Sequence, residues 1–161
     1  MKSQAVFFTA PGKSEIREWD CPDPDANQVQ VRCVANGICM GEVSLFSGRQ
    51  QSHYPRPVGH EGIGVVTKVP RNISHIREGD YVDCFGWSSY QNLDAHRVNK
   101  FRSPPKDPSV YLAEPAACVV TALYSYNITP GDRVLLLGAG YMGLLNVQGL
   151  SRYPLAELTV R

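Results

Sequence analysis

The sequence predicts a β-rich, partly closed barrel followed by the beginning of a parallel α/β sheet. Through the first hundred residues, short alternating or apolar runs are separated by turn segments, and the chain has 12 prolines and 14 glycines to form them. Many short strands at this spacing are typical of a barrel. After Pro108, a helical segment precedes a strand, a glycine loop, a helix and a second strand, the order of a β-α-β unit.

The strands of the first part are predicted from side-chain alternation and turn residues. In the segment 28–35, Val29, Val31 and Cys33 fall on one face and polar residues on the other, which is the pattern of a half-buried strand. The segments 62–69 and 80–84 are further strand candidates bounded by glycine or by turn residues.

After the predicted strands, a helix is expected at 114–126, buried and starting near Pro115, since proline is favoured in a first helical turn. A turn follows at 129–132. The uninterrupted apolar run 134–137 predicts a parallel strand covered on both faces, a helix is expected to about Arg152, and Glu157–Val160 is the second strand.

These elements predict two domains, at residues 1–126 and 127–161. A single β-α-β unit cannot cover both faces of a parallel sheet. We therefore expect the chain to be truncated within its second domain, or to depend on another polypeptide.

Composition excludes several classes of function. The net charge is +1, from 16 basic and 15 acidic residues, whereas binding to nucleic acid or to a membrane surface needs clustered excess Lys and Arg. We find neither a secretion signal nor the roughly 20 apolar residues of a membrane span, so a cytoplasmic location is expected. The five cysteines are odd in number and form no CxxC, which favours free thiols or metal ligands over disulfides.

The glycine loop predicts a dinucleotide site. Its pattern GxGxxG directly follows a strand and opens a helix, as the motif requires. Glycines are needed there for a tight turn, for approach of a pyrophosphate to the backbone, and for close helix packing, while the helix N-terminus favours phosphate. The acidic residue that would select NAD or NADP falls at or beyond Arg161, so the choice stays open. The expected cofactor-binding residues of this loop are Gly138, Gly140, Tyr141, Met142 and Gly143.

A second group of residues has the chemistry of a catalytic zinc site, which needs about three protein ligands and one open position. Cys39 stands at the start of a short helix expected at 41–46, where a thiolate is favoured. His60 and Glu61 lie between glycines, and Glu114 precedes Pro115. Each alone is explained equally simply as a buried thiol, a structural histidine or a helix-start charge. Their order, followed by the glycine loop, favours a metal centre.

The chain resembles the zinc-dependent medium-chain alcohol and polyol dehydrogenases, particularly the sorbitol and threonine dehydrogenase branch. The motifs that carry the resemblance span nearly the whole chain: Asn36-Gly37-Ile38-Cys39, Gly59-His60-Glu61, Gly79-Asp80-Tyr81-Val82, Glu114-Pro115-Ala116-Ala117, Gly131-Asp132-Arg133-Val134 and the glycine loop. The resemblance implies a GroES-like barrel followed by the first part of a Rossmann domain.

The same resemblance implies roles for individual residues. Cys39 and His60 would hold the catalytic zinc. Glu61 would be a direct or alternating ligand, and Glu114 a ligand or a partner of the zinc water. Thr121 would border the nicotinamide, although a purely structural threonine inside a helix is equally consistent.

The chain departs from the family in two places. The family has Gly-Ser-Asp or a relative after the ligand cysteine, where this chain has Met40-Gly41-Glu42, so Gly41 replaces the hydroxyl that starts the proton relay. Ser44, Glu42, or the zinc water backed by Glu61 are the alternatives. Only Cys84 lies where many members carry a four-cysteine lobe, which predicts one catalytic zinc and no structural zinc. Cys21, Cys33 and Cys118 are expected to be packing residues.

The expected function is zinc-assisted hydride transfer between a secondary alcohol or polyol and NAD or NADP. The longer enzyme would carry it out, the chain alone would be inactive, and the full-length protein would form a homo-oligomer. Two alternatives remain: a zinc-free enone or quinone reductase of the same superfamily, and a non-catalytic binding or assembly module.

Overall fold

The computed structural model describes residues 1–103 and 106–161, which form two compact units, Met1–Ala113 and Glu114–Arg161. The division falls ahead of the long helix that the sequence analysis assigned to the first domain. Among the described residues, no helix is both long enough and apolar enough to cross a membrane.

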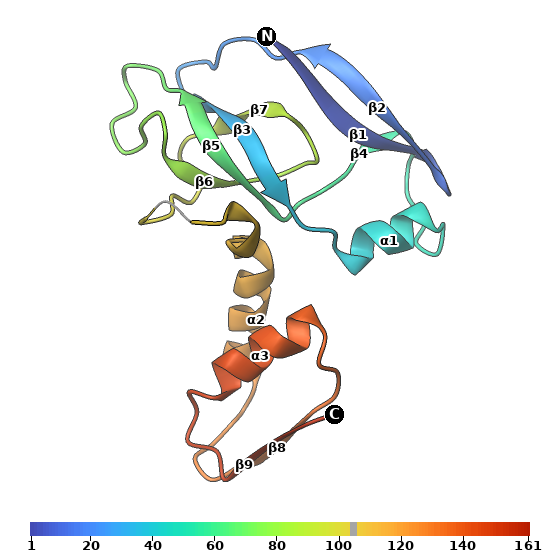
Figure 1. Cartoon of the computed structure of the whole chain (residues 1–161), viewed down its shortest axis with the longest axis vertical. Helices are drawn as coiled ribbons and strands as arrows, with labels where there is room; N and C mark the ends of the chain where they lie inside the picture. The colour runs from blue at the N-terminus through green and yellow to red at the C-terminus, as the bar shows by residue number, and fades with distance from the viewer. Residues whose placement is uncertain (104–105) are drawn as a thin grey trace. The chain divides into compact units, whose positions relative to one another are not determined.

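The first unit contains a small antiparallel sheet with the strand order β2-β1-β4. Its strands are β1 (Lys2–Ala10), β2 (Lys13–Asp20) and β4 (Arg56–Pro57) (Figure 1). Sequence reasoning missed these strands. The reason is visible in β2, where nearly every side chain on both faces is exposed, so that burial imposes no apolar alternation.

A larger antiparallel sheet in the same unit has the order β6-β5-β3-β7 (Figure 1). It is built from β3 (Gln28–Asn36), β5 (Gly62–Lys68), β6 (Tyr81–Cys84) and β7 (Tyr90–Asp94). The first three coincide with the predicted strands to within about one residue. The fourth was not predicted.

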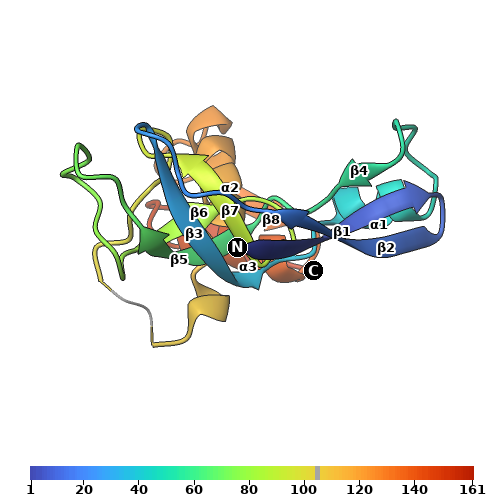
Figure 2. The ribbon, with the colours of Figure 1, turned by 90° about the horizontal axis from the view of Figure 1, so that it is seen from above.

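The core of the first unit lies on one face of this larger sheet. Its members are Val29, Val31, Val66, Ile73, Ile76, Val82, Cys84 and Ala95. The smaller sheet lies beside the larger one (Figure 2). Backbone bonds outside the strand pairs connect them: Val6 N donates to Trp87 O at 3.0 Å, and Ser89 N donates to Gln4 O at 2.8 Å. Among the described residues, the strands themselves form two separate sheets, which confirms a β-rich barrel that is only partly closed.

The second unit is the expected β-α-β arrangement preceded by a helix. It contains α2 (Ala113–Ser125), β8 (Arg133–Leu136), α3 (Tyr141–Leu150) and β9 (Glu157–Val160), after a short 3-10 helix, η1 (Pro108–Val110), in the first unit. Strands β8 and β9 pair in parallel from Arg133 opposite Glu157 to Leu136 opposite Val160.

Burial in the second unit differs from the prediction. The strand β8 was expected to be covered on both faces, and α2 to be buried, but Leu135 is 57% exposed and Val120 is 49% exposed. The physical reason is that β8 pairs only with β9 in the described part of the chain, and that of the residues of α2 only Pro115 and Val119 are buried. Cys118, expected to be a packing residue, is likewise exposed.

Glycine at position 64 is required by the close approach of β3. A side-chain carbon on Gly64 would lie 2.3 Å from Val31 Cγ1 and 2.8 Å from Arg32 O, whereas the nearest atom to one on Gly41 is Cys39 Sγ at 3.7 Å. We predict that Gly64→Ala destabilises the first unit by about 1–3 kcal/mol through overpacking. Gly41→Ala, inside a helix, should stabilise it by roughly 0.5–1 kcal/mol.

Urea unfolding followed by tryptophan fluorescence measures both effects, because the chain's two tryptophans, Trp19 and Trp87, lie in the first unit. The two variants share the same unfolded-state effect of adding a methyl group. Equal midpoints for the two variants would contradict the overpacking at Gly64.

Candidate metal centre

The helix α1 (Met40–Phe46) begins with a reciprocal cap that fixes Cys39. The Cys39 thiol accepts a hydrogen bond from Gly41 N at 3.4 Å, and Cys39 N donates to Glu42 Oε2 at 3.0 Å. This is the spacing of a capping box, with the thiol in place of the usual hydroxyl. The thiol is therefore held in place at the helix N-terminus.

Glu42 connects this helix to the segment that precedes β5. Its residue is only 5% exposed, and its Oε1 lies 2.6 Å from His60 Nδ1. Because an ionised carboxylate only accepts hydrogen bonds, this contact puts a proton on Nδ1 and leaves Nε2 able to bind a metal. The His60 side chain is 40% exposed. The imidazole ring is thus oriented by the buried Glu42 carboxylate, while part of the ring stays accessible to solvent.

Glu61 brings a second buried carboxylate to the same place, with Oε1 4.0 Å from His60 Nε2. Its Oε2 occupies the space above Gly37, since a side-chain carbon on Gly37 would lie 2.1 Å from that atom. Gly37 N donates to Glu61 O at 2.8 Å, and Gly37 O accepts from Trp87 Nε1 at 3.0 Å. Glycine at position 37 is therefore a steric requirement of the site.

The ligand atoms of Cys39, Glu42 and His60 all lie within 4.8 Å of one another. A thiolate, an imidazole nitrogen and a carboxylate are the donors that zinc takes in proteins. The residues present therefore fit a zinc ion. Sequence reasoning named Cys39 and His60, which the structure brings together. It considered Glu42 only as a proton carrier, although the spacing from Cys39 to Glu42 was the signal that could have found it.

Two other predicted site residues lie on α2 in the second unit. Glu114 stands in the first turn of the helix and accepts a hydrogen bond from Cys118 Sγ at 3.2 Å. Thr121 Oγ1 donates to Ala117 O at 2.9 Å, a bond within the helix that a structural threonine also makes. Metal binding by Glu114 and cofactor contact by Thr121 stay predictions.

The glycine loop joins β8 to α3 in the geometry that a phosphate site requires. Gly138 has φ +102, which favours glycine. A side-chain carbon on Gly143 would lie 2.0 Å from Gly138 O, whereas one on Gly140 would meet nothing within 4 Å. Gly140 caps α3 without a side-chain hydrogen bond, and Tyr141 and Met142 are 56% and 42% exposed. The first N–H groups of α3 are thus left for a ligand.

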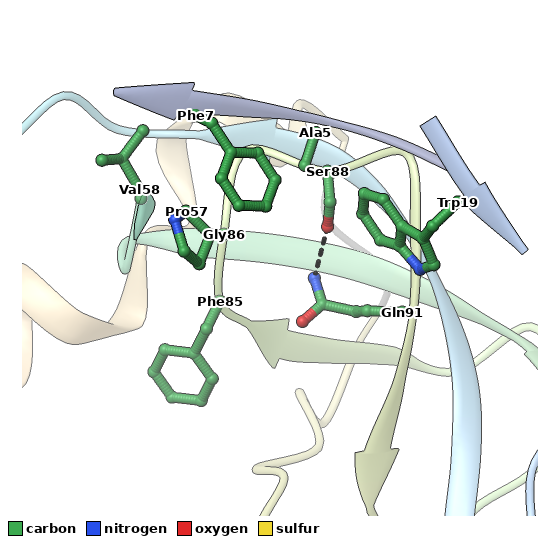
Figure 3. A pocket seen from close by; sticks show the side chains of 10 residues that line it. Ala5, Phe7, Trp19, Pro57, Val58, Phe85, Gly86, Ser88 and Gln91 are labelled. Carbon is green, nitrogen blue, oxygen red and sulfur yellow. Dashed lines mark hydrogen bonds between the residues drawn. The ribbon is translucent and has the colours of Figure 1, made fainter. Parts of the chain in front are cut away.

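Two apolar hollows lie in the first unit. One, of about 500 Å³, is bounded by Phe7, Trp19 and Pro57, with Ser88 and Gln91 hydrogen-bonded to each other at its floor (Figure 3). The other, of about 210 Å³, shares Glu42 with the metal cluster. Its remaining lining residues are Phe8, Ile38, Val43, Phe46 and Trp87. The space next to the cluster is therefore apolar.

Comparison with known proteins agrees with this geometry. Residues 25–92 match the alcohol dehydrogenase GroES-like domain. The chain is 24% identical to sorbitol dehydrogenase of Ovis aries over 97% of its own length and 54% of that protein's. It is 28% identical to D-arabinitol dehydrogenase 1 of Uromyces fabae, over 89% of the chain and 50% of the relative.

Solved structures of dehydrogenases also resemble this chain. An alcohol dehydrogenase of Escherichia coli, determined in complex with NADH, superposes with a TM-score of 0.81 at 25% identity, covering 99% of this chain and 56% of the other. A zinc-binding dehydrogenase of Sinorhizobium meliloti bound to NADP has the same fold, with a TM-score of 0.82 at 22% identity, covering 99% of this chain and 56% of that one.

The chain spans about half the length of the curated relatives it matches. The matched domain lies within the first unit, whereas the similarity to sorbitol dehydrogenase and to the Escherichia coli structure covers residues of both units. Residues 25–92 therefore match an alcohol dehydrogenase GroES-like domain, and the chain as a whole is similar to alcohol and polyol dehydrogenases of the zinc-dependent medium-chain family.

Proposed function

We propose that this chain supplies the metal centre and the first part of the dinucleotide site of an enzyme that interconverts a secondary alcohol or polyol and its carbonyl compound, with NAD or NADP as the hydride carrier. The observation that carries the proposal is the cluster of Cys39, Glu42 and His60, whose ligand atoms lie within 4.8 Å of one another. A glycine loop of the right geometry in the second unit supports it.

The residues of the first unit would bind the metal ion and orient its ligands. Cys39 Sγ and His60 Nε2 would hold zinc, with Glu61 as a third or alternating ligand and Glu42 fixing the imidazole. Zinc, when bound, polarises a substrate oxygen as a Lewis acid. Glu114 is proposed to complete the set of ligands or to contact water at the metal, as the family resemblance of Glu114-Pro115-Ala116-Ala117 implies.

The proton released on alcohol oxidation needs a path that does not use Gly41. Both oxygens of Glu42 are engaged, one with His60 Nδ1 and one with Cys39 N. A proton placed on Glu42 would therefore break the cap or release the imidazole. We infer that Glu61 or Ser44 accepts the proton, and that Glu42 keeps its two hydrogen bonds.

The second unit contributes the start of the nucleotide site. The N–H groups at the beginning of α3 would bind the pyrophosphate, with Gly140 allowing its close approach. The nicotinamide, when bound, accepts the hydride. The whole enzyme would act on a small alcohol or polyol in the cytoplasm, as a homo-oligomer and with a single catalytic zinc.

Zinc content tests the proposal directly. We predict one zinc per folded chain for the wild type and loss of that zinc in Cys39→Ser, because serine's hydroxyl is a much poorer ligand than a thiolate. Cys118→Ser, which changes an exposed thiol on α2, is the matched control and should keep its zinc. Elemental mass spectrometry measures the metal, and circular dichroism verifies folding. A folded wild type that takes up no zinc from a zinc-containing buffer would favour the zinc-free reductase or a non-catalytic module.

Glu42→Gln tests the orientation of His60. Glutamine keeps the size of the side chain but removes the charge that holds the proton on Nδ1, so zinc affinity should fall about 10–100-fold. Glu78→Gln, on an exposed turn, is the control and should leave the affinity unchanged. Competition with a chromogenic chelator measures both affinities. A larger loss than this would indicate that Glu42 is itself a ligand, and no loss would exclude both roles.

Gly140→Ala tests the nucleotide site. An added methyl group meets no protein atom within 4 Å, so the fold should persist, but the methyl stands where the pyrophosphate approaches. We predict roughly ten-fold weaker binding of NADH, followed by its fluorescence. Gln148→Ala, on the last turn of α3, should bind as the wild type does. Equal affinities in the two variants would mean that the pyrophosphate lies elsewhere.

A further inference from the structure

The larger of the two hollows lies between the two sheets of the first unit, where the barrel is not closed. Ala5 of β1 is joined to Ser88, just ahead of β7, by an isolated antiparallel bridge. Next to this bridge, a space of about 500 Å³ is lined by Phe7 and Trp19 from the smaller sheet and by Gln91 from the larger one (Figure 3). Its volume lies within the roughly 300–1,000 Å³ of pockets that bind small molecules.

Strand β1 separates this hollow from the candidate metal centre. Successive side chains of a strand point to opposite faces, so Phe7 and Phe8 lie on different faces of β1. Phe8 contacts Phe46 of α1, with the ring centroids 5.2 Å apart, whereas Phe7 lines the hollow. None of the described residues that line it belongs to the metal cluster. The hollow is therefore a separate feature of the unit.

Aromatic rings form the walls of the hollow. Trp19 of β2 is paired with Ser3 of β1. Directly paired residues share a face, so Trp19 lies on the same face as Phe7. The Arg17 guanidinium carbon stands 4.9 Å from the centre of the Phe7 ring, and this cation–π contact holds the ring in place. Flat aromatic molecules pack well against such rings, in offset-stacked or edge-to-face arrangements.

Two neutral polar side chains meet at the floor of the hollow. Gln91 Nε2 donates a hydrogen bond to Ser88 Oγ at 3.2 Å (Figure 3). An amide oxygen can accept up to two hydrogen bonds, but in the described part of the chain no hydrogen bond reaches Gln91 Oε1. The floor therefore offers a ligand one acceptor at a fixed place in an otherwise apolar wall.

The charges around the hollow select a neutral ligand. None of the described residues that line it is charged. Arg17, which stands over Phe7 on the same face, forms an ion pair with Glu15, so its charge is already compensated. An ion moved from water into such surroundings would lose its hydration without gaining a partner. A neutral molecule avoids this cost.

We propose that this hollow is a binding site for a neutral, planar aromatic molecule that carries a hydroxyl group. The rings of Phe7 and Trp19 contact the aromatic system, and the hydroxyl donates to Gln91 Oε1. Phe85, which is 49% exposed, stands at the mouth. A phenolic carbon bears no hydrogen that could leave as hydride, so such a molecule is bound and is not a substrate for alcohol oxidation. The site is therefore additional to the metal centre and to the nucleotide loop.

Titration with a matched pair of small molecules tests the proposal on the chain as it is. Umbelliferone, a hydroxycoumarin, is planar, aromatic and, in slightly acidic buffer, neutral, and coumarin is the same molecule without the hydroxyl. Nuclear magnetic resonance of the isotope-labelled chain follows the Trp19 indole and the Gln91 side-chain amide. Both signals should shift and saturate with umbelliferone, at a dissociation constant of roughly 0.1–1 mM for a ligand of this size. Absence of a saturable shift would overturn the proposal.

The hydroxyl contact is tested by the same pair. One hydrogen bond changes affinity by about 3–10-fold, so coumarin should bind the wild type that much more weakly than umbelliferone does. Gln91→Met removes the amide at nearly constant length, and it should weaken the binding of umbelliferone by the same factor while leaving that of coumarin unchanged. Equal affinities of the two molecules for the wild type would contradict the contact with Gln91.

Two variants separate the two hollows. Trp19→Ala removes one wall and should weaken the binding of umbelliferone at least about ten-fold. Phe46→Ala, which alters the smaller hollow on the other face of β1, should leave the affinity unchanged. Circular dichroism verifies folding, and if Trp19→Ala does not fold, the comparison of the wild type with Gln91→Met decides the matter. Binding that is lost in Phe46→Ala and kept in Trp19→Ala would place the ligand in the smaller hollow and overturn the proposal.

Discussion

The Glu42 carboxylate is the contact on which the candidate metal centre depends. One oxygen closes the cap of α1 on Cys39 N, and the other holds Nδ1 of His60, which lies eighteen residues along the chain. A buried carboxylate is costly unless its oxygens are hydrogen-bonded, so both contacts are needed for Glu42 to be buried at all. The thiol at the start of the helix and the imidazole before β5 are thereby fixed by one side chain. Neither could move without leaving a buried charge unpaired.

Glycines provide the space that this arrangement needs. Gly37 leaves room for a Glu61 oxygen that would otherwise be 2.1 Å from a side-chain carbon. Gly62 and Gly64 let β3 and β6 bring their side chains together above β5. The same holds in the second unit, where the absence of a side chain at Gly143 leaves room for the carbonyl oxygen of Gly138. In both units, glycines leave the space that the candidate ligand-binding and cofactor-binding groups occupy.

Sequence reasoning succeeded where burial imposes a pattern. The alternation in β3 and the glycine loop before α3 identified those elements nearly to the residue, and Cys39 and His60, which the resemblance predicts as ligands, lie in one cluster. It failed for β2, whose exposed residues carry no periodic signal. It also overestimated the burial of β8 and α2, because an apolar segment does not reveal how much surface is available to cover it. The hydrogen bond between Glu42 and His60 was not predicted, because it depends on a tertiary contact that local sequence spacing does not encode.

Charge balance favours an orienting role for Glu42. A zinc dication with one thiolate and one carboxylate is neutral, which suits a buried site, whereas a second carboxylate ligand would leave a net negative charge in low dielectric. Glu42 already has its charge compensated by two N–H donors, while Glu61 lies 4.0 Å from the free nitrogen of His60. We therefore propose Cys39, His60 and Glu61 as the ligands of the neutral set, with Glu42 orienting the imidazole and Glu114 in its alternative role as a partner of water at the metal. If Glu61 were displaced from the metal, it would leave a coordination position for a substrate oxygen, and its carboxylate would then be a base beside that oxygen.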